Sequence, residues 1–166
     1  MLQAMANETI ITNVTDILAI CSSIIESASN EVVYISPPSM LVLASQLALR
    51  EKIKLFIQKA GSVRGIADFS HQYISEMREL LDIGTDVRHI SQYQGIFMLV
   101  GDGRESISSM SIDVESLSID TPLKALWSDN PTYTEYLMST FEMAWEQSVP
   151  AAQRIEELLK EGPPDI

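Results

Sequence analysis

The chain has 166 residues, of which 46% are hydrophobic and 20% are charged, and this is typical of one globular domain rather than of a disordered segment. The formal net charge of −12 repels nucleic-acid backbones and anionic lipid surfaces. Membrane helices need about 20 apolar residues in a row, and no such run or signal peptide is present. The single cysteine, Cys21, cannot form an internal disulfide. We therefore expect a cytoplasmic domain that binds neither nucleic acid nor membranes.

The N-terminal part of the sequence alternates helical and extended patterns. Residues 7–28 carry apolar side chains at spacings of four and three, which predicts a helix with Asn7 at its N-terminal cap. This stripe suits either packing on the sheet of the same domain or a dimer seam. Residues 31–36 are rich in β-branched side chains and predict a strand. Residues 39–60 contain neither Gly nor Pro and predict one continuous helix.

Further alternation follows in the middle of the sequence. The pattern predicts a strand, a helix and a strand over residues 62–68, 70–84 and 86–91. Residues 95–101 form an apolar run that predicts a buried strand. The Asp102-Gly103 dipeptide then predicts a hairpin turn into a partner strand over residues 106–112.

After Pro122 the pattern becomes helical again, with a long helix that opens at Pro131 and is interrupted at Pro150. The order of elements implies parallel strands joined by right-handed crossovers, with an antiparallel hairpin at one side. We therefore expect a three-layer α/β domain over residues 1–149, with a mixed, mostly parallel sheet and helices on both faces. Residues 150–166 would extend it as a C-terminal helix.

Ligands of open α/β sheets bind beyond the carboxyl ends of the parallel strands. The polar residues predicted to line a ligand site are Ser36, Arg64, Asp68, His71, Arg88, His89 and Tyr93. Arg64 and Arg88 have the forked geometry that binds anions, and His89 can respond to pH or hydrogen-bond a ligand. Each residue also has a purely structural interpretation, as an ion-paired strand residue or part of the core.

Catalytic and metal-binding patterns are scarce. Asp68 and His71 have suitable chemistry for an acid and a base, but no nucleophile accompanies them. Two histidines and one cysteine offer no clustered zinc site, and neither a phosphate-binding glycine loop nor a nucleophile elbow is present. We therefore expect no metal and no cofactor.

The strand and turn over residues 95–107 resemble one half of the phospholipase D fold. That superfamily carries the motif H-x-K-x-x-x-x-D, in which the histidine is the nucleophile and the lysine stabilises the phosphoryl oxygens. When Asp102 is aligned with the aspartate, Gly95 and Phe97 stand where the histidine and the lysine should be. Neither residue can do that chemistry. The resemblance therefore implies a protein that shares the fold and is not an enzyme.

Two further resemblances imply a regulatory role. Trp127, Asn130-Pro131, Phe141 and Trp145 are similar to the end of the sensor domains of TrmB-like archaeal transcription regulators. Several motifs resemble the phospholipase-D-like input domains of thaumarchaeal sensor histidine kinases: Arg88-His89, Gly95-x-Phe97, Glu105-x-Ile107 and Trp145 followed by VPAAQRIEELLKEG. These resemblances imply a sensor domain that binds a small ligand or a partner. A downstream kinase or DNA-binding module would then receive the signal through the terminal helices.

The last helix carries a narrow apolar stripe of Ile155, Leu158 and Leu159 among charged residues, which favours pairing with another chain in a homodimer. Two other functions stay open from the sequence. One is a degenerate phosphodiesterase-like enzyme that acts on small molecules, and the other is a dimerisation module without a ligand.

Overall fold

The computed structural model describes residues 7–91, 96–109 and 117–164. Within them one eight-stranded sheet forms the centre of an α/β fold. Its strands are β1 (Glu8–Asn13), β2 (Glu31–Ile35), β3 (Ser62–Ala67), β4 (Asp86–His89), β5 (Phe97–Gly101), β6 (Glu105–Ser109), β7 (Pro122–Ser128) and β8 (Val149–Pro150). Their order across the sheet is β1-β7-β6-β5-β2-β3-β4-β8.

The sheet is mixed, as expected, with β2, β3 and β4 running parallel to one another. The other neighbouring strands pair antiparallel. Antiparallel pairs therefore outnumber parallel ones, and the sheet is less parallel than the sequence suggested. The difference arises because β1, β7 and β8 add pairs that local patterns did not reveal.

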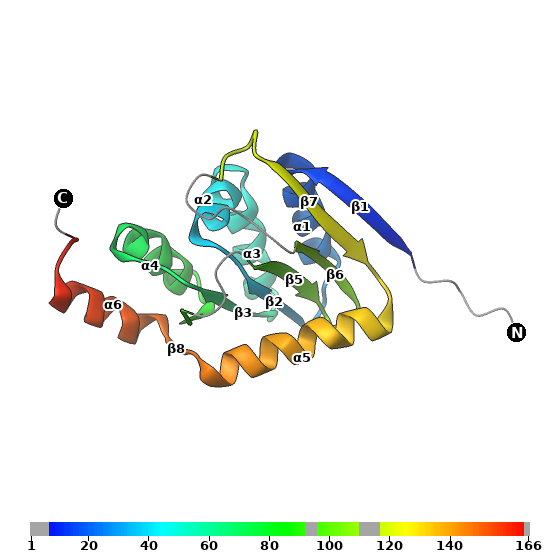
Figure 1. Cartoon of the computed structure of the whole chain (residues 1–166). Coiled ribbons are helices and arrows are strands. Elements are labelled where there is room, and N and C mark those ends of the chain that lie inside the picture. Colours follow the sequence, from blue (N-terminus) through cyan, green and yellow to red (C-terminus); the bar gives the residue numbers. More distant parts are fainter. Residues whose placement is uncertain (1–6, 92–95, 110–116, 165–166) are drawn as a thin grey trace, which may run out of the picture.

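Helices cover both faces of the sheet (Figure 1). They are α1 (Val14–Ser27), α2 (Pro38–Gln46), α3 (Leu49–Gln58), α4 (Ile74–Asp82), α5 (Pro131–Gln147) and α6 (Ala151–Glu161), with a short 3-10 helix, η1 (His71–Tyr73). The first core joins α1, α2 and α3 to one face, and the second joins α5 to the other. A third core packs α4 and α6 together beside β4. The α/β fold with a C-terminal helix is thus confirmed.

The apolar stripe of the first predicted helix is divided between a strand and a helix. Residues of β1 pair antiparallel with β7, so that the helix begins only at Val14. Asn13, rather than Asn7, is the N-terminal cap, and its side chain accepts a hydrogen bond from the N–H of Asp16 at 2.8 Å. The apolar face of α1 is buried in the first core, which satisfies it within the chain. Burial also raises the pKa of the Cys21 thiol to about 12.

Two other predicted elements differ in the structure. The helix expected over residues 39–60 is divided into α2 and α3 at Ala48, which takes a left-handed conformation with φ 63°. The segment from Pro122 is the strand β7 rather than a helix. Every second residue, such as Leu123 and Ala125, packs into the first core, and the strand joins β1 to β6.

The predicted hairpin turn is present and is fixed by one carboxylate. Asp102 and Gly103 both have positive φ, 53° and 66°, as a tight hairpin between β5 and β6 requires. The Asp102 carboxylate accepts backbone hydrogen bonds from Ser29, Asn30 and Glu31 at 2.7–2.9 Å. Its side chain is only 6% exposed. The aspartate of the phospholipase D motif is thus used here to attach the turn to the start of β2.

Several opposing effects act on the pKa of Asp102. Burial alone would raise this pKa, but the backbone hydrogen bonds and the ion pair with Arg104 outweigh burial and hold it below its ordinary value of 3.8. The contribution of the ionised carboxylate to stability is therefore complete above the unfolded-state pKa and is lost as the pH falls through the folded-state pKa.

We expect Asp102→Ala to lower the free energy of unfolding by about 2–3 kcal/mol, because three backbone donors lose a charged acceptor. Asp102→Asn should cost less at neutral pH and should lose less stability than the wild type on acidification below about pH 4. Urea unfolding measures both. Arg104→Ala is the control and should cost less than about 1 kcal/mol, because its ion pair is exposed. Equal acid losses in the wild type and Asp102→Asn would contradict this role.

Candidate functional site

The carboxyl ends of β2, β3 and β4 meet at one edge of the sheet, which we name the carboxyl edge. Ser36 follows β2, Asp68 follows β3, and His89 is the last residue of β4. The N–H of Ser36 donates to the Ile66 carbonyl at 3.0 Å, so β2 and β3 stay joined up to this edge. The structure therefore brings together three of the residues that the sequence predicted for a ligand site.

His89 is buried at the end of β4 on this edge and is hydrogen-bonded through both ring nitrogens. Its Nδ1 accepts from the N–H of Phe69 at 3.3 Å, and its Nε2 lies 3.3 Å from the hydroxyl of Ser91. Since Nδ1 accepts, the proton of the neutral ring is on Nε2, which donates to Ser91. The edge of the Phe69 ring also packs on His89, with ring centroids 5.1 Å apart.

The surroundings of His89 favour its neutral form. Burial lowers its pKa below the ordinary value of 6.5, and Arg154 on α6 acts in the same direction. Asp68 and Glu157, with the hydrogen bond to the backbone of Ala67, favour the charged form but do not compensate for burial. The imidazole is therefore neutral at pH 7 and is a hydrogen-bonding group rather than a charge.

Asp68 provides an acceptor that no described residue uses. Its Oδ1 lies 3.9 Å from Nε2 of His89, beyond hydrogen-bond distance. Its Oδ2 is buried and has no hydrogen-bond partner among the described residues. A buried carboxylate oxygen without a donor is costly unless a bound molecule or water provides one. The carboxyl edge thus holds a buried acceptor for which the described residues provide no donor.

The arrangement differs from a Ser-His-Asp triad. In a triad the carboxylate binds Nδ1 and the serine donates its proton to Nε2. Here the Phe69 amide occupies Nδ1, whereas Asp68 and Ser91 both lie on the Nε2 side. In this tautomer His89 donates to Ser91 and cannot take its proton.

Arg64 lies on the face of the sheet that α5 covers and does not reach the carboxyl edge. Its guanidinium binds the carboxylates of Glu31 and Glu142 at 2.7 and 2.6 Å. It also lies over the rings of Phe141 and Trp145, 5.0 and 5.2 Å from their centroids. The expected role of Arg64 in gripping an anionic ligand is not supported, because its donors are engaged in attaching α5 to the sheet.

Arg88 belongs to the same face and also contacts α5. Its guanidinium lies 4.5 Å from the ring centroid of Trp145, and Nη1 is 3.5 Å from the Trp145 carbonyl. Because neighbouring residues of a strand point to opposite faces, Arg88 and His89 serve different surroundings. The arginine contacts the helix, and the histidine contacts the carboxyl edge.

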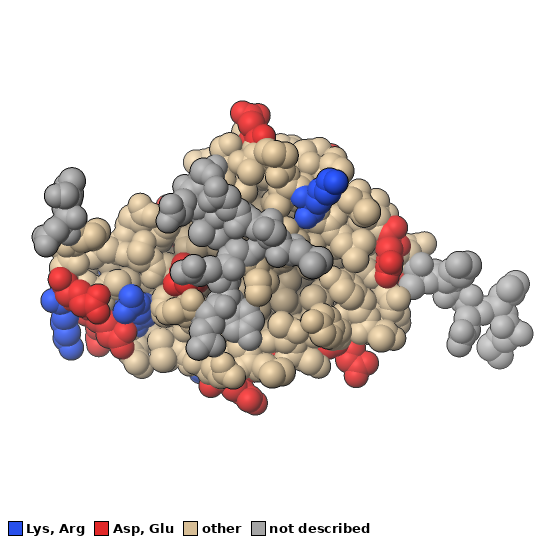
Figure 2. Space-filling view, viewed as in Figure 1, with Lys and Arg blue, Asp and Glu red and all other residues tan. Residues whose placement is uncertain are grey.

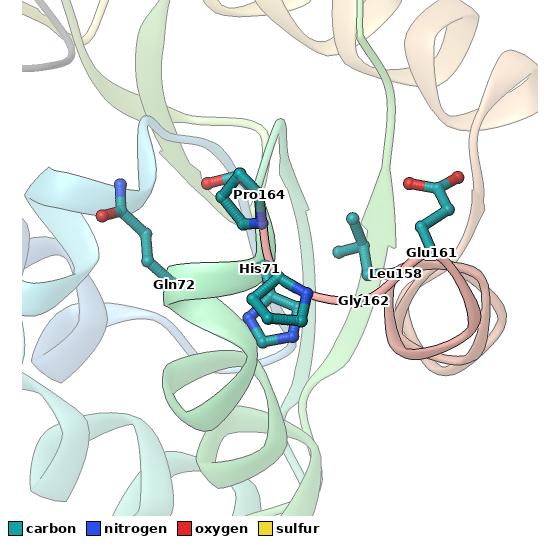
Figure 3. A pocket seen from close by; sticks show the side chains of 8 residues that line it. His71, Gln72, Leu158, Glu161, Gly162 and Pro164 are labelled. Carbon is teal, nitrogen blue, oxygen red and sulfur yellow. The ribbon is translucent and has the colours of Figure 1, made fainter. Parts of the chain in front are cut away.

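The remaining predicted residues lie elsewhere. His71 lines a separate cavity of about 670 Å³ between η1 and the end of α6, where Leu158 and Glu161 face it (Figure 3). Ile155 and Leu158 of the last helix are buried in the third core, so only Leu159 of that stripe, 49% exposed, is available to another chain. Tyr93 lies outside the described residues.

Two features of the site were not among the predicted residues. Ser91 is the hydrogen-bond partner of His89, and β8 pairs antiparallel with the end of β4. The register of that pair places Pro150 beside Arg88 and Val149 beside His89. The sequence offered no signal for a strand of two residues, and it marked Pro150 only as a break between helices.

The structure is similar to solved structures at low sequence identity. Nuc from Salmonella typhimurium, a phospholipase D family member, has a TM-score of 0.69 at 13% identity, over 88% of this chain and 98% of Nuc. Phosphatidylserine synthase from Haemophilus influenzae has a TM-score of 0.60 at 12% identity, over 94% of this chain and 44% of the synthase. TrmBL2, an archaeal chromatin protein that shows a novel mode of DNA binding, has a TM-score of 0.65 at 13% identity, over 85% of this chain.

The chain spans about half of TrmBL2, 52% of its length. No protein-family model matches the sequence, and no curated protein is similar to it. Together these likenesses show a phospholipase-D-like fold, as the motif around Asp102 had implied.

The prediction that the chain is not an enzyme is wrong. Structures with the same fold include a synthase and a member of the phospholipase D family. Departures from the motif at Gly95 and Phe97 therefore do not exclude catalysis. Among the described residues, no three His, Cys, Asp or Glu side chains gather to hold a metal ion. In that same part of the chain no helix has the length and apolar character to cross a membrane.

We expect the stability of the wild type to decrease as the pH falls from 6.5 towards the lower folded-state pKa of His89. In this range the unfolded chain binds a proton that the folded chain does not. The slope from this one group cannot exceed about 1.4 kcal/mol per pH unit. His89→Gln should remove the slope, whereas Ser91→Ala should retain it. Thermal unfolding at a series of pH values measures this, and a His89→Gln profile parallel to that of the wild type would contradict the assignment.

Proposed function

We propose that this chain is a regulatory sensor domain in which a small polar ligand binds at the carboxyl edge and the terminal helices α5 and α6 transmit the signal. The fold supports a ligand site at this edge, because open α/β sheets bind ligands there. The Oδ2 atom of Asp68, buried and without a partner among the described residues, supports it further.

One observation supports signalling through the helices above all others. Consecutive residues of β4 contact the carboxyl edge and the junction between α5 and α6: His89 hydrogen-bonds at the edge, and Arg88 stacks on Trp145 of α5. The backbone of the same two residues pairs with β8, which joins α5 to α6. A ligand that moves β4 therefore moves the start of α6 as well, and a shift of packed helices is a common means of signalling.

The groups at the edge favour a neutral or cationic ligand. Asp68 provides an unused carboxylate oxygen, and His89 is held neutral. The two predicted arginines, Arg64 and Arg88, are directed to α5, and Arg154 on α6 is ion-paired with Glu157. A ligand with hydroxyl, amide or amino groups would satisfy Asp68, whereas a phosphate or a carboxylate would be repelled by it.

The proposal includes a signalling context. We propose that residues 1–149 form the sensor, and that residues 150–166 lead to a kinase or DNA-binding module in the cytoplasm. The likeness to TrmBL2, an archaeal chromatin protein, supports a link to transcription control. The DNA binding described for TrmBL2 is a property of that protein and is not proposed for this domain. The formal charge of −12 supports a role in which this domain itself does not contact nucleic acid.

A second candidate function is a phosphodiester hydrolase, favoured by the likeness to Nuc over 98% of the length of Nuc. With Gly95 and Phe97 at the motif positions, His89 at the carboxyl edge would be the group that transfers a proton. Release of nitrophenolate from bis(p-nitrophenyl) phosphate, lost in His89→Gln, would favour the hydrolase over the sensor.

We expect a ligand of the proposed class to change the fluorescence of Trp145, because this ring stacks on Arg88 beside the edge. In a Trp127→Phe background Trp145 is the only tryptophan. A panel of amino acids, polyamines, nucleosides and monosaccharides would be screened first by thermal shift and then by titration. Asp68→Asn should weaken binding of a hit at least tenfold. A panel without hits, or a hit that Asp68→Asn does not affect, would contradict the proposal.

Arg88→Lys separates binding from transmission. Lysine keeps the charge but lacks the flat guanidinium that stacks on an indole. Calorimetric affinity for the hit should stay within about twofold of the wild type, while the Trp145 response should be strongly reduced. A full response in Arg88→Lys would show that the signal does not pass through this contact.

A further inference from the structure

Strand β1 forms one outer edge of the sheet (Figure 1). It pairs with β7 on its inner side and has no strand partner on its outer side among the described residues. Five of its six residues are exposed, and Ile10 is 67% exposed. Such an edge offers unpaired backbone donors and acceptors to any strand of suitable shape.

The residues whose backbone groups face outward follow from the pairing with β7. Asn7 and Asp129 form a hydrogen-bonded pair, in which the Asn7 carbonyl accepts from the N–H of Asp129 at 3.2 Å. Hydrogen bonding alternates along an antiparallel strand, so the odd-numbered residues of β1 bond to β7. The even-numbered residues Glu8 and Ile10 therefore direct their N–H and C=O groups to the open edge, and Thr12 lies at the register shift that ends this pattern.

The usual protection of an edge strand is absent from most of β1. Its sequence, ETIITN, contains no Lys and no Pro, and four of its residues are β-branched. A register shift occurs only at its end, between Ile11 and Asn13. Residues of this kind have the highest preference for strand pairing, and an isolated domain that leaves such an edge open is prone to self-association.

We propose that this edge pairs with β1 of a second copy of the chain, antiparallel and across a two-fold axis that passes through Ile10. In this register Ile10 faces Ile10 of the second copy, and Glu8 faces Thr12 of the second copy. Both pairs use the outward backbone groups. Since each such pair exchanges two N–H···O=C bonds, the outward groups of Glu8 and Ile10 are satisfied. The two sheets become one continuous sheet.

Charge complementarity favours this occupant and this register. Glu8 is the only charged residue of β1, and the register keeps it away from its own copy. Lys124 is exposed on β7, on the same sheet face as Leu126, which is the partner of Ile10. Lys124 has no ion-pair partner among the described residues. In the proposed dimer, Glu8 lies beside Thr12 of the second copy, and Lys124 of that copy lies on the next strand. Two symmetric attractive pairs result.

Figure 2 shows charged side chains of both signs gathered at the α6 end of the viewed face, with single charged side chains elsewhere on it. The inference is independent of the proposed sensor function. It differs from the pairing of last helices that the sequence suggested, because Ile155 and Leu158 are buried within the chain.

Light scattering coupled to gel filtration, on the full chain over a range of concentrations, tests the proposal. The wild type should approach twice the chain mass of 18.5 kDa as the concentration rises. Ile10→Lys should weaken the dimer at least tenfold, with an unchanged circular dichroism spectrum and melting temperature, because Ile10 is exposed in the single chain. Leu159→Lys, at another exposed apolar residue, is the matched control and should leave the dimer intact.

A charge exchange tests the register. Glu8→Lys should weaken the dimer, and Glu8→Lys combined with Lys124→Glu should restore it, since the two charges attract across the interface in either orientation. A wild type that stays monomeric at all concentrations would overturn the proposal. A dimer broken by Leu159→Lys but not by Ile10→Lys would overturn it too, and so would open-ended assembly beyond a dimer.

Discussion

The attachment of α5 to the sheet rests on two arginines that are held between strands and a helix. Arg64 is ion-paired with Glu31 on the sheet and Glu142 on α5, and its guanidinium lies over two aromatic rings of the same helix. Arg88 lies over Trp145 one turn further along. A cation over an aromatic ring is worth about 0.5–2 kcal/mol, most when it is shielded from water. Because the guanidinium of Arg64 is partly buried, removal of both carboxylates would leave its charge without compensation.

This attachment gives β4 a double role. The strand is short and lies between β3 and β8, so its last two residues contact the carboxyl edge, the helix α5 and the junction before α6. Because neighbouring side chains of a strand point to opposite faces of the sheet, β4 contacts the proposed ligand site on one face and α5 on the other.

The sequence predicted the parts of the fold that local pattern determines. The strand around Val33, the turn at Asp102-Gly103 and the helix from Pro131 are all present. It missed β1 and β7 because their pairing joins residues such as Ile10 and Leu126, which lie far apart in the chain. Adjacent apolar residues in ETIITN suit a helix as well as a strand, and only the partner strand decides between them.

The candidate site could be predicted in part for the same reason. Asp68 and His89 were identified because they end parallel strands. Arg88 was grouped with them although it precedes His89 directly, and in a strand such neighbours point to opposite faces. Strict use of that alternation would have separated the two residues from sequence alone. The unused Asp68 oxygen and the β8 pairing depend on side-chain packing and on a two-residue strand, which no local pattern reveals.

In the proposed mechanism, β4 couples the carboxyl edge to the terminal helices. Hydrogen exchange on the wild type and His89→Gln, at a pH where both are folded, tests this most directly. We expect faster exchange at the edge and also in β8, in the C-terminal half of α5 and at the start of α6, with α1 unchanged. Faster exchange confined to the neighbours of residue 89 would contradict the coupling.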